Sequence, residues 1–304
     1  MSMPWKCPHC GKKLKPKREG GLYCLKNHQF DTAKEGYFYL LPVQNRKTKL
    51  PGDSKEMITA RRVFLNAGYY QIFGDALGAL CLEYGIPLAQ QMQNGKKRKA
   101  AAPVQSGCET APLHLLDTGC GEGWYDRAIA AAFAEAEKPL ALAGFDIAKD
   151  AVRLAAKALP SAQYAVGSSF AQPVQTEWAD VLINVFSPLA LEEFHRVLRA
   201  DGIFIYAVPS ARHLFGMKEV LYETPYENPV QQPDYAGFTL LERRSVTGQI
   251  TLPKEMLSSL FAMTPYYWKT PRDGAERLMA QESLTTEISF DFLVFQKSEL
   301  PQAE

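Results

Sequence analysis

Beyond His114 the chain alternates short apolar runs with stretches of helical periodicity. The apolar runs predict strands at Leu113–Asp117, Leu140–Ile147, Gln163–Val166, Ala179–Phe186 and Gly202–Val208, and two more near Thr239–Val246 and Glu287–Gln296. The stretches between them predict helices at Trp124–Ala136, Lys149–Ala158, Leu189–Leu198 and Lys254–Phe261. This alternation is typical of an α/β fold with a mostly parallel, doubly wound sheet and right-handed crossovers. Ligands of such sheets bind beyond the carboxyl ends of the strands.

The first third of the chain follows a different pattern. Residues 1–42 lack apolar periodicity and are rich in cysteine, glycine, lysine and aromatic residues. Residues 53–92 favour helix, with Asp53–Ser54 as the cap of a first helix and a second helix over Ile72–Tyr84. Residues 92–111 are polar, basic and rich in helix breakers, which indicates an exposed loop. We expect a small module at 1–42, a helical connector at 43–111 with the basic loop 92–111, and a larger domain at 112–304.

Composition narrows the class of protein. Of the 304 residues, 46% are hydrophobic, which is enough for a substantial core. We find no run of 18 uncharged apolar residues and no apolar signal-peptide core at the N-terminus, so we expect no membrane span and a cytoplasmic location. In that compartment the six cysteines are expected to be thiols or metal ligands.

Charge is distributed unevenly along the chain. Residues 1–62 hold 14 Lys and Arg against 5 Asp and Glu, a balance of +9. Because the net charge of the whole chain is +1, the remaining residues carry −8. A basic block joined to an acidic domain of catalytic size suggests a polyanionic partner, although a solvated lysine-rich surface explains the charge alone equally well.

A glycine-rich loop joins the first predicted strand of the larger domain to its helix; its key positions are Asp117, Gly119, Gly121, Glu122 and Gly123. Glycines permit a sharp turn and leave no Cβ between the backbone and a ligand. The spacing differs from the G-x-G-x-x-G of pyrophosphate-binding folds, and the flanking acidic residues suit a ligand with an ammonium and a sulfonium group. Asp146 lies at the end of the next strand. Its carboxylate can accept hydrogen bonds from ribose hydroxyls or cap the following helix. The pattern predicts a site for S-adenosylmethionine.

A cysteine–histidine cluster lies near the N-terminus. Two residues separate Cys7 from Cys10, and after thirteen more residues three separate Cys24 from His28. This is a tetrahedral zinc spacing, and a segment of about 40 residues with few apolar side chains needs a metal to fold. A redox cysteine pair is disfavoured, because no strand–helix context surrounds it and Cys24 and His28 would have no role. We predict a structural Zn²⁺ site.

With both motifs in place, the chain resembles the bacterial large-subunit (23S) ribosomal RNA guanine-N1 methyltransferases along nearly its whole length. Further stretches that carry the resemblance are Gln29-Phe-Asp31, Ala33-Lys-Glu-Gly-Tyr37, Leu40-Leu-Pro-Val-Gln44, Pro51-Gly-Asp-Ser54, Ala60-Arg-Arg62, Arg212-His-Leu214, Gly237-Phe-Thr239 and Met263-Thr-Pro265. Together these stretches are far more specific than the glycine loop, which occurs across many methyltransferases.

The resemblance implies a Rossmann-like class I methyltransferase domain with a small N-terminal zinc-binding module. It implies a homodimer that transfers a methyl group from S-adenosylmethionine to a guanine in a hairpin of 23S ribosomal RNA. It also implies that the cofactor site is lined by Tyr70, Gly121, Glu122 and His213. Two segments depart from the family pattern, since the 92–111 loop is longer and more basic and Asn184–Pro188 matches only loosely.

Methylation of guanine N1 sets chemical requirements for the site. The N1 atom lies on the Watson–Crick edge, so the base must be unpaired or extruded. A carboxylate or an imidazole can take the imino proton. By position the candidates are His213 and Glu122, and each is equally well explained as a cofactor contact. Asn184–Pro188, after the fourth strand, can shape the target pocket or be an ordinary loop.

Contacts to RNA phosphates are expected from basic residues of the N-terminal block: Lys12, Lys13, Arg46, Lys47, Arg61 and Arg62. Tyr37 and Phe38 can stack on bases or cover the core of the small module. Two alternatives stay open. One is a methyltransferase with a zinc knuckle that acts on another RNA position, a protein or a small molecule. The other is an RNA-binding protein with a vestigial cofactor domain, against which the complete glycine loop and Asp146 argue.

Overall fold

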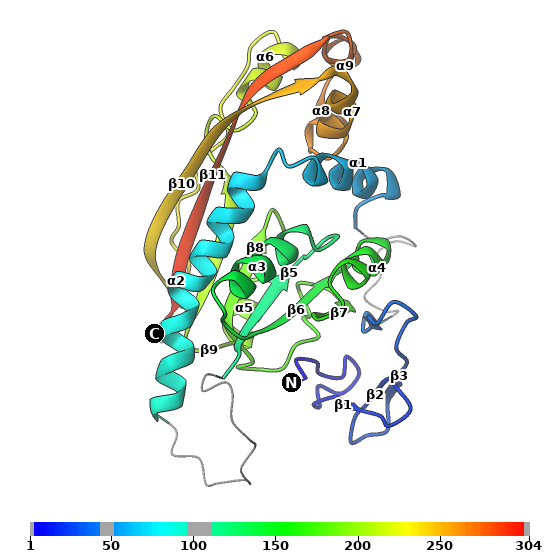
Figure 1. The fold of residues 1–304 in the computed structure, drawn as a ribbon, viewed down its shortest axis with the longest axis vertical. Helices are drawn as coiled ribbons and strands as arrows, with labels where there is room; N and C mark the ends of the chain where they lie inside the picture. Colours follow the sequence, from blue (N-terminus) through cyan, green and yellow to red (C-terminus); the bar gives the residue numbers. More distant parts are fainter. Residues whose placement is uncertain (1–2, 43–51, 96–110, 301–304) are drawn as a thin grey trace.

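The computed structural model describes residues 3–42, 52–95 and 111–300 (Figure 1). Arg46, Lys47 and most of the basic loop 92–111 lie outside the described residues. Near the N-terminus, strands β1 (Lys15–Pro16), β2 (Leu22–Tyr23) and β3 (Gln29–Phe30) form a small antiparallel sheet.

Among the described residues, eight strands form the main sheet in the order β10-β11-β9-β8-β5-β6-β7-β4. Their bounds are β4 Phe38–Tyr39, β5 Leu113–Thr118, β6 Leu140–Asp146, β7 Gln163–Val166, β8 Ala179–Val185, β9 Leu198–Pro209, β10 Phe238–Pro253 and β11 Ser283–Lys297. Neighbours from β4 to β9 are parallel, whereas β11 is antiparallel to both β9 and β10. The predicted mostly parallel sheet is therefore confirmed. The strand order reverses at β5, so the ligand crevice of such a sheet is expected at its carboxyl end.

Successive residues of β5 enter two different cores, Leu115 on one face of the sheet and Leu116 on the other. Helices α2 (Gln71–Gly95), α3 (Trp124–Glu135) and α4 (Lys149–Ala158) cover the first face. On the second face lie α5 (Leu191–Val197) and the N-terminal module. The sheet is therefore covered on both sides, as its near-continuous apolar strands require.

Helices α1 (Lys55–Asn66) and α2 form the predicted helical connector. The predicted cap is confirmed, since Ser54 Oγ accepts the Met57 backbone N–H at 3.3 Å. By length and composition α2 is apolar enough to cross a membrane. However, its side chains Phe73, Leu77 and Leu80 are fully buried in the first core, which is the behaviour of a core helix.

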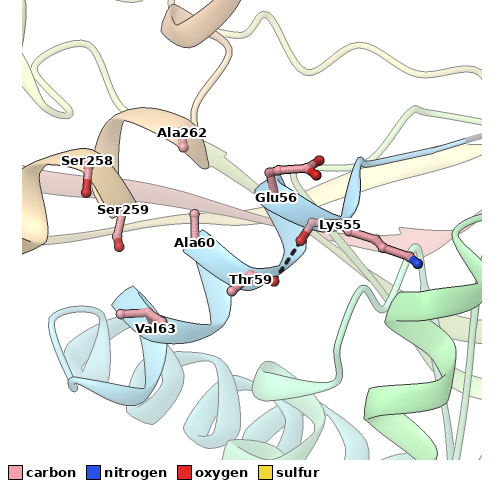
Figure 2. Close-up of a pocket in the computed structure, with 8 residues that line it drawn as sticks. All are labelled: Lys55, Glu56, Thr59, Ala60, Val63, Ser258, Ser259 and Ala262. Atoms are coloured by element: carbon pink, nitrogen blue, oxygen red, sulfur yellow. Dashed lines mark hydrogen bonds between the residues drawn. The ribbon is translucent and has the colours of Figure 1, made fainter.

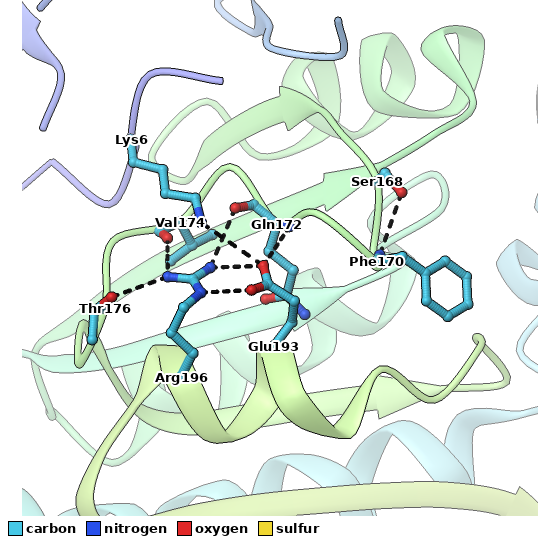
Figure 3. Close-up of polar contacts among 8 residues, drawn as sticks. All are labelled: Lys6, Ser168, Phe170, Gln172, Val174, Thr176, Glu193 and Arg196. Atoms are coloured by element: carbon cyan, nitrogen blue, oxygen red, sulfur yellow. Dashed lines mark hydrogen bonds and ion pairs between the residues drawn. The ribbon is translucent and has the colours of Figure 1, made fainter. Parts of the chain in front are cut away.

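The N-terminal module is attached to the main sheet through backbone and side-chain contacts. Strand β4 extends the main sheet parallel to β7, and Trp5, which is completely buried, forms an antiparallel bridge with Val174. Figure 3 shows Lys6 beside Glu193, with 3.9 Å between Nζ and Oε2. Arg196 binds the same carboxylate through two hydrogen bonds of 2.6 and 2.8 Å. The module is thus fixed against the second face of the sheet.

The hairpin β10–β11 extends well beyond the rest of the sheet. Only the half of β11 from Phe290 to Gln296 pairs with β9, and the other half pairs with β10 alone. Around this extension lie short helices, at the upper end of Figure 1. They are α6 (Phe215–Leu221), α7 (Lys254–Ala262), α8 (Tyr266–Lys269) and α9 (Arg272–Met279). Of these, the sequence pattern predicted α7.

Candidate cofactor site and metal centre

The glycine-rich loop lies at the carboxyl end of β5, where the sheet order reverses. Gly119, Gly121 and Gly123 adopt φ values of +86°, +54° and +75°, in the left-handed region that favours glycine. A Cβ on Gly119 would lie 2.2 Å from the hydroxyl oxygen of Ser187, whereas one on Gly121 would meet nothing within 4 Å. The loop therefore packs tightly at Gly119 and leaves space for a ligand at Gly121.

Two buried carboxyl groups lie behind the loop. Asp117 is 1% exposed, and among the described residues no N–H group and no hydroxyl donates to either of its oxygens. Burial, together with the nearby Asp126, raises the pKa of Asp117 well above its usual range. Burial also raises the pKa of Asp126 to about 6, although the Tyr164 hydroxyl donates to it at 2.8 Å. Two such carboxyls favour a shared proton or a cationic ligand group.

Asp146 fastens the loop to the neighbouring strand. Its carboxylate accepts the backbone N–H of Gly121 at 3.0 Å and that of Ala148 at 2.8 Å. The predicted role of Asp146 as a helix cap is wrong, because the N-cap of α4 is Ala148 and no side chain caps that helix. Asp146 instead fixes the turn before α4, and each of its oxygens retains a lone pair for a ligand hydroxyl.

Glu122 is 3% exposed, and neither of its oxygens accepts a hydrogen bond from a described residue. Its carboxylate lies 3.6 Å from an Arg127 guanidinium nitrogen. Burial raises the pKa of Glu122, and the positive charges of Arg127, Arg62 and Arg61 oppose that shift. Arg61 and Arg62, expected on RNA phosphates, thus act electrostatically on the acidic edge of the cofactor loop. Arg61 also pairs with Asp53.

Tyr70 and His213 meet although 143 residues separate them. His213 Nδ1 accepts the Ser289 backbone N–H at 3.2 Å, so the ring proton belongs on Nε2, which lies 3.1 Å from the Tyr70 hydroxyl. Burial, followed by the charge of Lys218, lowers the pKa of His213 to about 3. Both ring nitrogens therefore have partners, and burial favours the neutral imidazole.

A chain of aromatic rings links this pair to the glycine loop. Phe290 lies 4.9 Å from Tyr70 and 4.7 Å from Phe73, between ring centroids. Phe73 in turn lies 4.9 Å from Tyr125, the second residue after the loop, between ring centroids. All the predicted cofactor residues thus occupy one continuous region at the carboxyl end of the sheet.

The four predicted metal ligands converge in the N-terminal module. The ligand atoms of Cys7, Cys10, Cys24 and His28 all lie within 4.8 Å of one another. His28 Nδ1 is 3.4 Å from Cys7 Sγ and 3.3 Å from Cys24 Sγ, and the sulfurs of Cys10 and Cys24 are 3.6 Å apart. A tetrahedral zinc with ligands at about 2.0–2.3 Å separates ligand atoms by about 3.5–3.8 Å. The donor set and its geometry fit Zn²⁺.

The remaining candidates for RNA contact are two exposed lysines and two aromatic residues that are buried or half-buried. Lys12 and Lys13 are exposed on the N-terminal module. Tyr37 is only 4% exposed and belongs to the first core, while Phe38 is half-buried in β4. Tyr37 therefore packs in the first core of the main sheet and not in a core of the small module, whereas Phe38 packs against the second core, which includes residues of the module.

A surface pocket of about 450 Å³ lies between α1 and α7 (Figure 2). Its lining from α1 comprises Lys55, Glu56, Thr59, Ala60 and Val63. Because residues three and four apart share a helix face, this lining is opposite to the face that carries Ile58 and Arg61. None of the predicted cofactor residues lines the pocket, so it is separate from the cofactor edge.

Sequence reasoning missed several residues of this region: Asp126, Tyr164 and Lys218. Asp126 follows the loop motif on α3, but its partner Tyr164 comes from β7, so only the fold reveals the pair. Lys218 is fully buried and donates to the Tyr226 carbonyl and to Asn228 Oδ1, each at 2.8 Å. No sequence signal distinguishes such a lysine from an exposed one.

Two family models match the chain, the RlmA N-terminal zinc ribbon over residues 5–49 and a methyltransferase domain over residues 116–206. YxjB of Bacillus subtilis (strain 168), whose name places it among the 23S rRNA (guanine-N(1)-)-methyltransferases, is 28% identical over 96% of this chain and 97% of its own. The 23S rRNA (guanine(748)-N(1))-methyltransferase of Streptomyces fradiae is 28% identical over 91% of this chain and 90% of that protein.

A third relative, from Micromonospora griseorubida, has a name of the same kind and is 35% identical over 69% of this chain and 66% of the relative. The matches span both the cysteine–histidine module and the glycine-loop domain. The cofactors of these two parts are structural zinc and S-adenosylmethionine. The chain belongs to the family of 23S rRNA (guanine-N1)-methyltransferases.

Proposed function

We propose that the protein transfers a methyl group from S-adenosylmethionine to N1 of a guanine in a hairpin of 23S ribosomal RNA. The observation that carries the proposal is the length of the match with YxjB, which covers 97% of that protein and includes both the zinc module and the cofactor loop. A methyltransferase for a small molecule has no need of a basic module fixed to its sheet. The zinc ligands in this proposal are Cys7, Cys10, Cys24 and His28.

S-adenosylmethionine supplies an electrophilic methyl carbon on a sulfonium, and the cofactor residues proposed here hold it in place. We assign Asp117, with its two unpartnered oxygens, to the cationic end of the cofactor. Asp146 is assigned to the ribose hydroxyls, and Gly119, Gly121 and Gly123 to the close backbone approach. Much of the rate enhancement then comes from orienting the guanine for in-line displacement.

The proton on guanine N1 must leave as the methyl group arrives. His213 is unsuited to accept it, because its basic nitrogen already accepts the Ser289 N–H. Glu122 retains its lone pairs, and burial makes it a stronger base than an exposed glutamate. We therefore propose Glu122 as the acceptor, and Tyr70 with His213 as the wall of the cofactor site.

The wider setting follows from the same proposal. Lys12 and Lys13 contact RNA phosphates, with residues 1–42 as the recognition module, 43–111 as connector and 112–304 as the catalytic domain. The protein works in the cytoplasm as a homodimer, which size-exclusion chromatography with light scattering can test.

The activity is tested with purified protein and methyl-labelled S-adenosylmethionine on unmodified 23S rRNA, 16S rRNA and a peptide mixture. We expect label in 23S rRNA alone, recovered after nuclease digestion as N1-methylguanosine. A Glu122→Gln variant should retain cofactor binding and lose about 10²-fold or more in transfer rate. Label in peptides, or in 16S rRNA alone, would favour the alternative substrates instead.

A further inference from the structure

Phe186, the residue directly after β8, combines backbone strain with exposure. Its φ of +51° lies in the left-handed region that disfavours residues with a side chain, and the side chain is 46% exposed. An aromatic ring that serves only to pack a core is normally buried. Strain of this kind persists where the surrounding structure imposes it, and it clusters at functional sites.

The segment that carries Phe186 is fastened to the cofactor loop. Asn184 is fully buried and donates from Nδ2 to Thr118 Oγ1 at 3.2 Å. Ser187 lies directly on Gly119, where an added Cβ would be 2.2 Å from the serine hydroxyl oxygen. The ring between these two anchors therefore stands beside the loop that we assign to the cofactor.

One side of the Phe186 ring packs against other aromatic rings, and the rest of the ring is exposed. Its centroid lies 5.6 Å from that of Phe73 and 6.0 Å from that of Phe290, and both of these rings are fully buried. These contacts hold the ring in place from the core. Its exposed part remains available to another flat, apolar surface.

Other exposed aromatic side chains among the described residues come from other elements. Phe170, 68% exposed, follows β7 by four residues (Figure 3). Tyr23 is on β2, Tyr226 follows α6, and Tyr267 and Trp268 are on α8. Of these exposed rings, Phe186 is the one whose neighbour in the chain, Ser187, lies against Gly119.

We propose that Phe186 stacks on the target guanine and holds its N1 edge toward the methyl donor, an inference that rests on the proposed function. A base extruded from a helix loses its stacking neighbours, and an aromatic side chain replaces them. The left-handed backbone at Phe186 turns the chain out of the extended line of β8. Phe186 is on this account a positioning residue, which takes no part in bond formation.

Three substitutions separate stacking from packing. Phe186→Leu keeps apolar bulk and backbone strain but removes the flat ring, Phe186→Tyr keeps the ring, and Phe170→Ala removes an exposed ring elsewhere. The readouts are single-turnover transfer to 23S rRNA, the cofactor dissociation constant and the thermal midpoint. A fourth readout is the fluorescence of 2-aminopurine placed at the methylated position of an RNA hairpin, which stacking quenches.

We expect Phe186→Leu to lower the transfer rate by about 5–100-fold, in line with the loss of one base–aromatic stack. Its cofactor affinity should stay within twofold of wild type, and its 2-aminopurine signal should rise. Phe186→Tyr and Phe170→Ala should resemble wild type in every readout. A Phe186→Leu variant with wild-type rate and quenching would overturn the inference, as would a rate loss matched by equal losses of cofactor affinity or stability. If wild-type protein methylates no RNA, the proposed function itself fails.

Discussion

At the scale of single residues, sequence reasoning located the groups that belong to a contiguous motif. Asp117, the loop glycines and the four metal ligands could be predicted because spacing along the chain determines their roles. Asp126 could not, since its partner Tyr164 comes from another element, and for Phe186 the sequence indicated only that the segment Asn184–Pro188 can shape the target pocket. The predicted end of the fourth strand at Phe186 also differs from the structure, where β8 ends at Val185 and Phe186 turns into a left-handed conformation.

The close approach of Gly119 to Ser187 gives a prediction for a pair of substitutions. Gly119→Ala should weaken cofactor binding by at least about tenfold, because its Cβ would displace the 184–188 segment and its φ of +86° is unfavourable for alanine. Adding Ser187→Gly removes the clashing atoms and should restore part of the affinity. Calorimetric titration with the cofactor gives the binding free energies of the wild type, the two single variants and the double variant, which form a double-mutant cycle. Strictly additive effects of the two substitutions on that free energy would refute the contact.

His213 gives a prediction for stability as a function of pH. Its folded pKa of about 3 lies below the unfolded value of about 6.5, so the unfolded state binds the extra proton below pH 6.5. The buried His213 therefore lowers the free energy of unfolding as pH falls from about 6.5 toward 3, by about 1.4 kcal/mol per pH unit. His213→Gln should show a smaller loss of unfolding free energy between pH 7 and pH 5 in urea titrations. Equal losses in the two proteins would contradict a neutral, buried His213.

At the scale of elements, patterns of burial decide what sequence can predict. Helix α4 and strand β7 match their predicted bounds, because the amphipathic or buried character is clear at both ends. The outer half of the β10–β11 hairpin could not be predicted, since it is rich in polar residues and its few buried apolar side chains, Leu252, Leu284 and Ile288, pack in a core that helices from elsewhere in the chain complete. Strand β4 is too short to show a pattern, yet it joins the N-terminal module to the main sheet.

The metal ligands belong to the N-terminal module, whereas the cofactor loop belongs to the main sheet. Loss of the metal should therefore affect the two parts differently. Cys24→Ser should lose zinc and transfer to RNA, while cofactor affinity stays within a few fold, because β5, β6 and α3 hold the loop without any metal ligand. Cys81→Ala, at a buried cysteine far from the cluster, should retain zinc. Metal analysis and cofactor titration provide the measurements, and full zinc content in Cys24→Ser would disprove the assigned ligand set.

At the scale of the whole molecule, the basic N-terminal module and the acidic cofactor edge occupy one rigid framework. The module packs on the second face of the sheet, and the cofactor loop lies at the carboxyl ends of its strands. A hairpin held by the module can therefore present a base to the loop. Sequence predicted both parts but not their attachment, which depends on Trp5, Lys6 and β4 meeting residues far along the chain.

This arrangement predicts a salt-dependent contribution from the module. The double variant Lys12→Ala/Lys13→Ala should bind 23S rRNA more weakly, with a slope of log affinity against log salt reduced by about 1–2. Lys138→Ala, exposed near the amino end of β6, should leave the slope unchanged. Filter binding at several salt concentrations makes the comparison. An unchanged slope in the double variant would place the RNA elsewhere.

The central claim is the identity of the methylated atom. Unmodified 23S rRNA treated with wild-type protein, or with Gly119→Ala as control, can be mapped by mass spectrometry of nuclease fragments and by reverse-transcriptase stops. We predict one N1-methylguanosine in a hairpin, made by the wild type, and a lower yield from the variant when the cofactor concentration is close to the wild-type dissociation constant. A methyl group on another guanine atom or another base, or no methylation of 23S rRNA, would contradict the account.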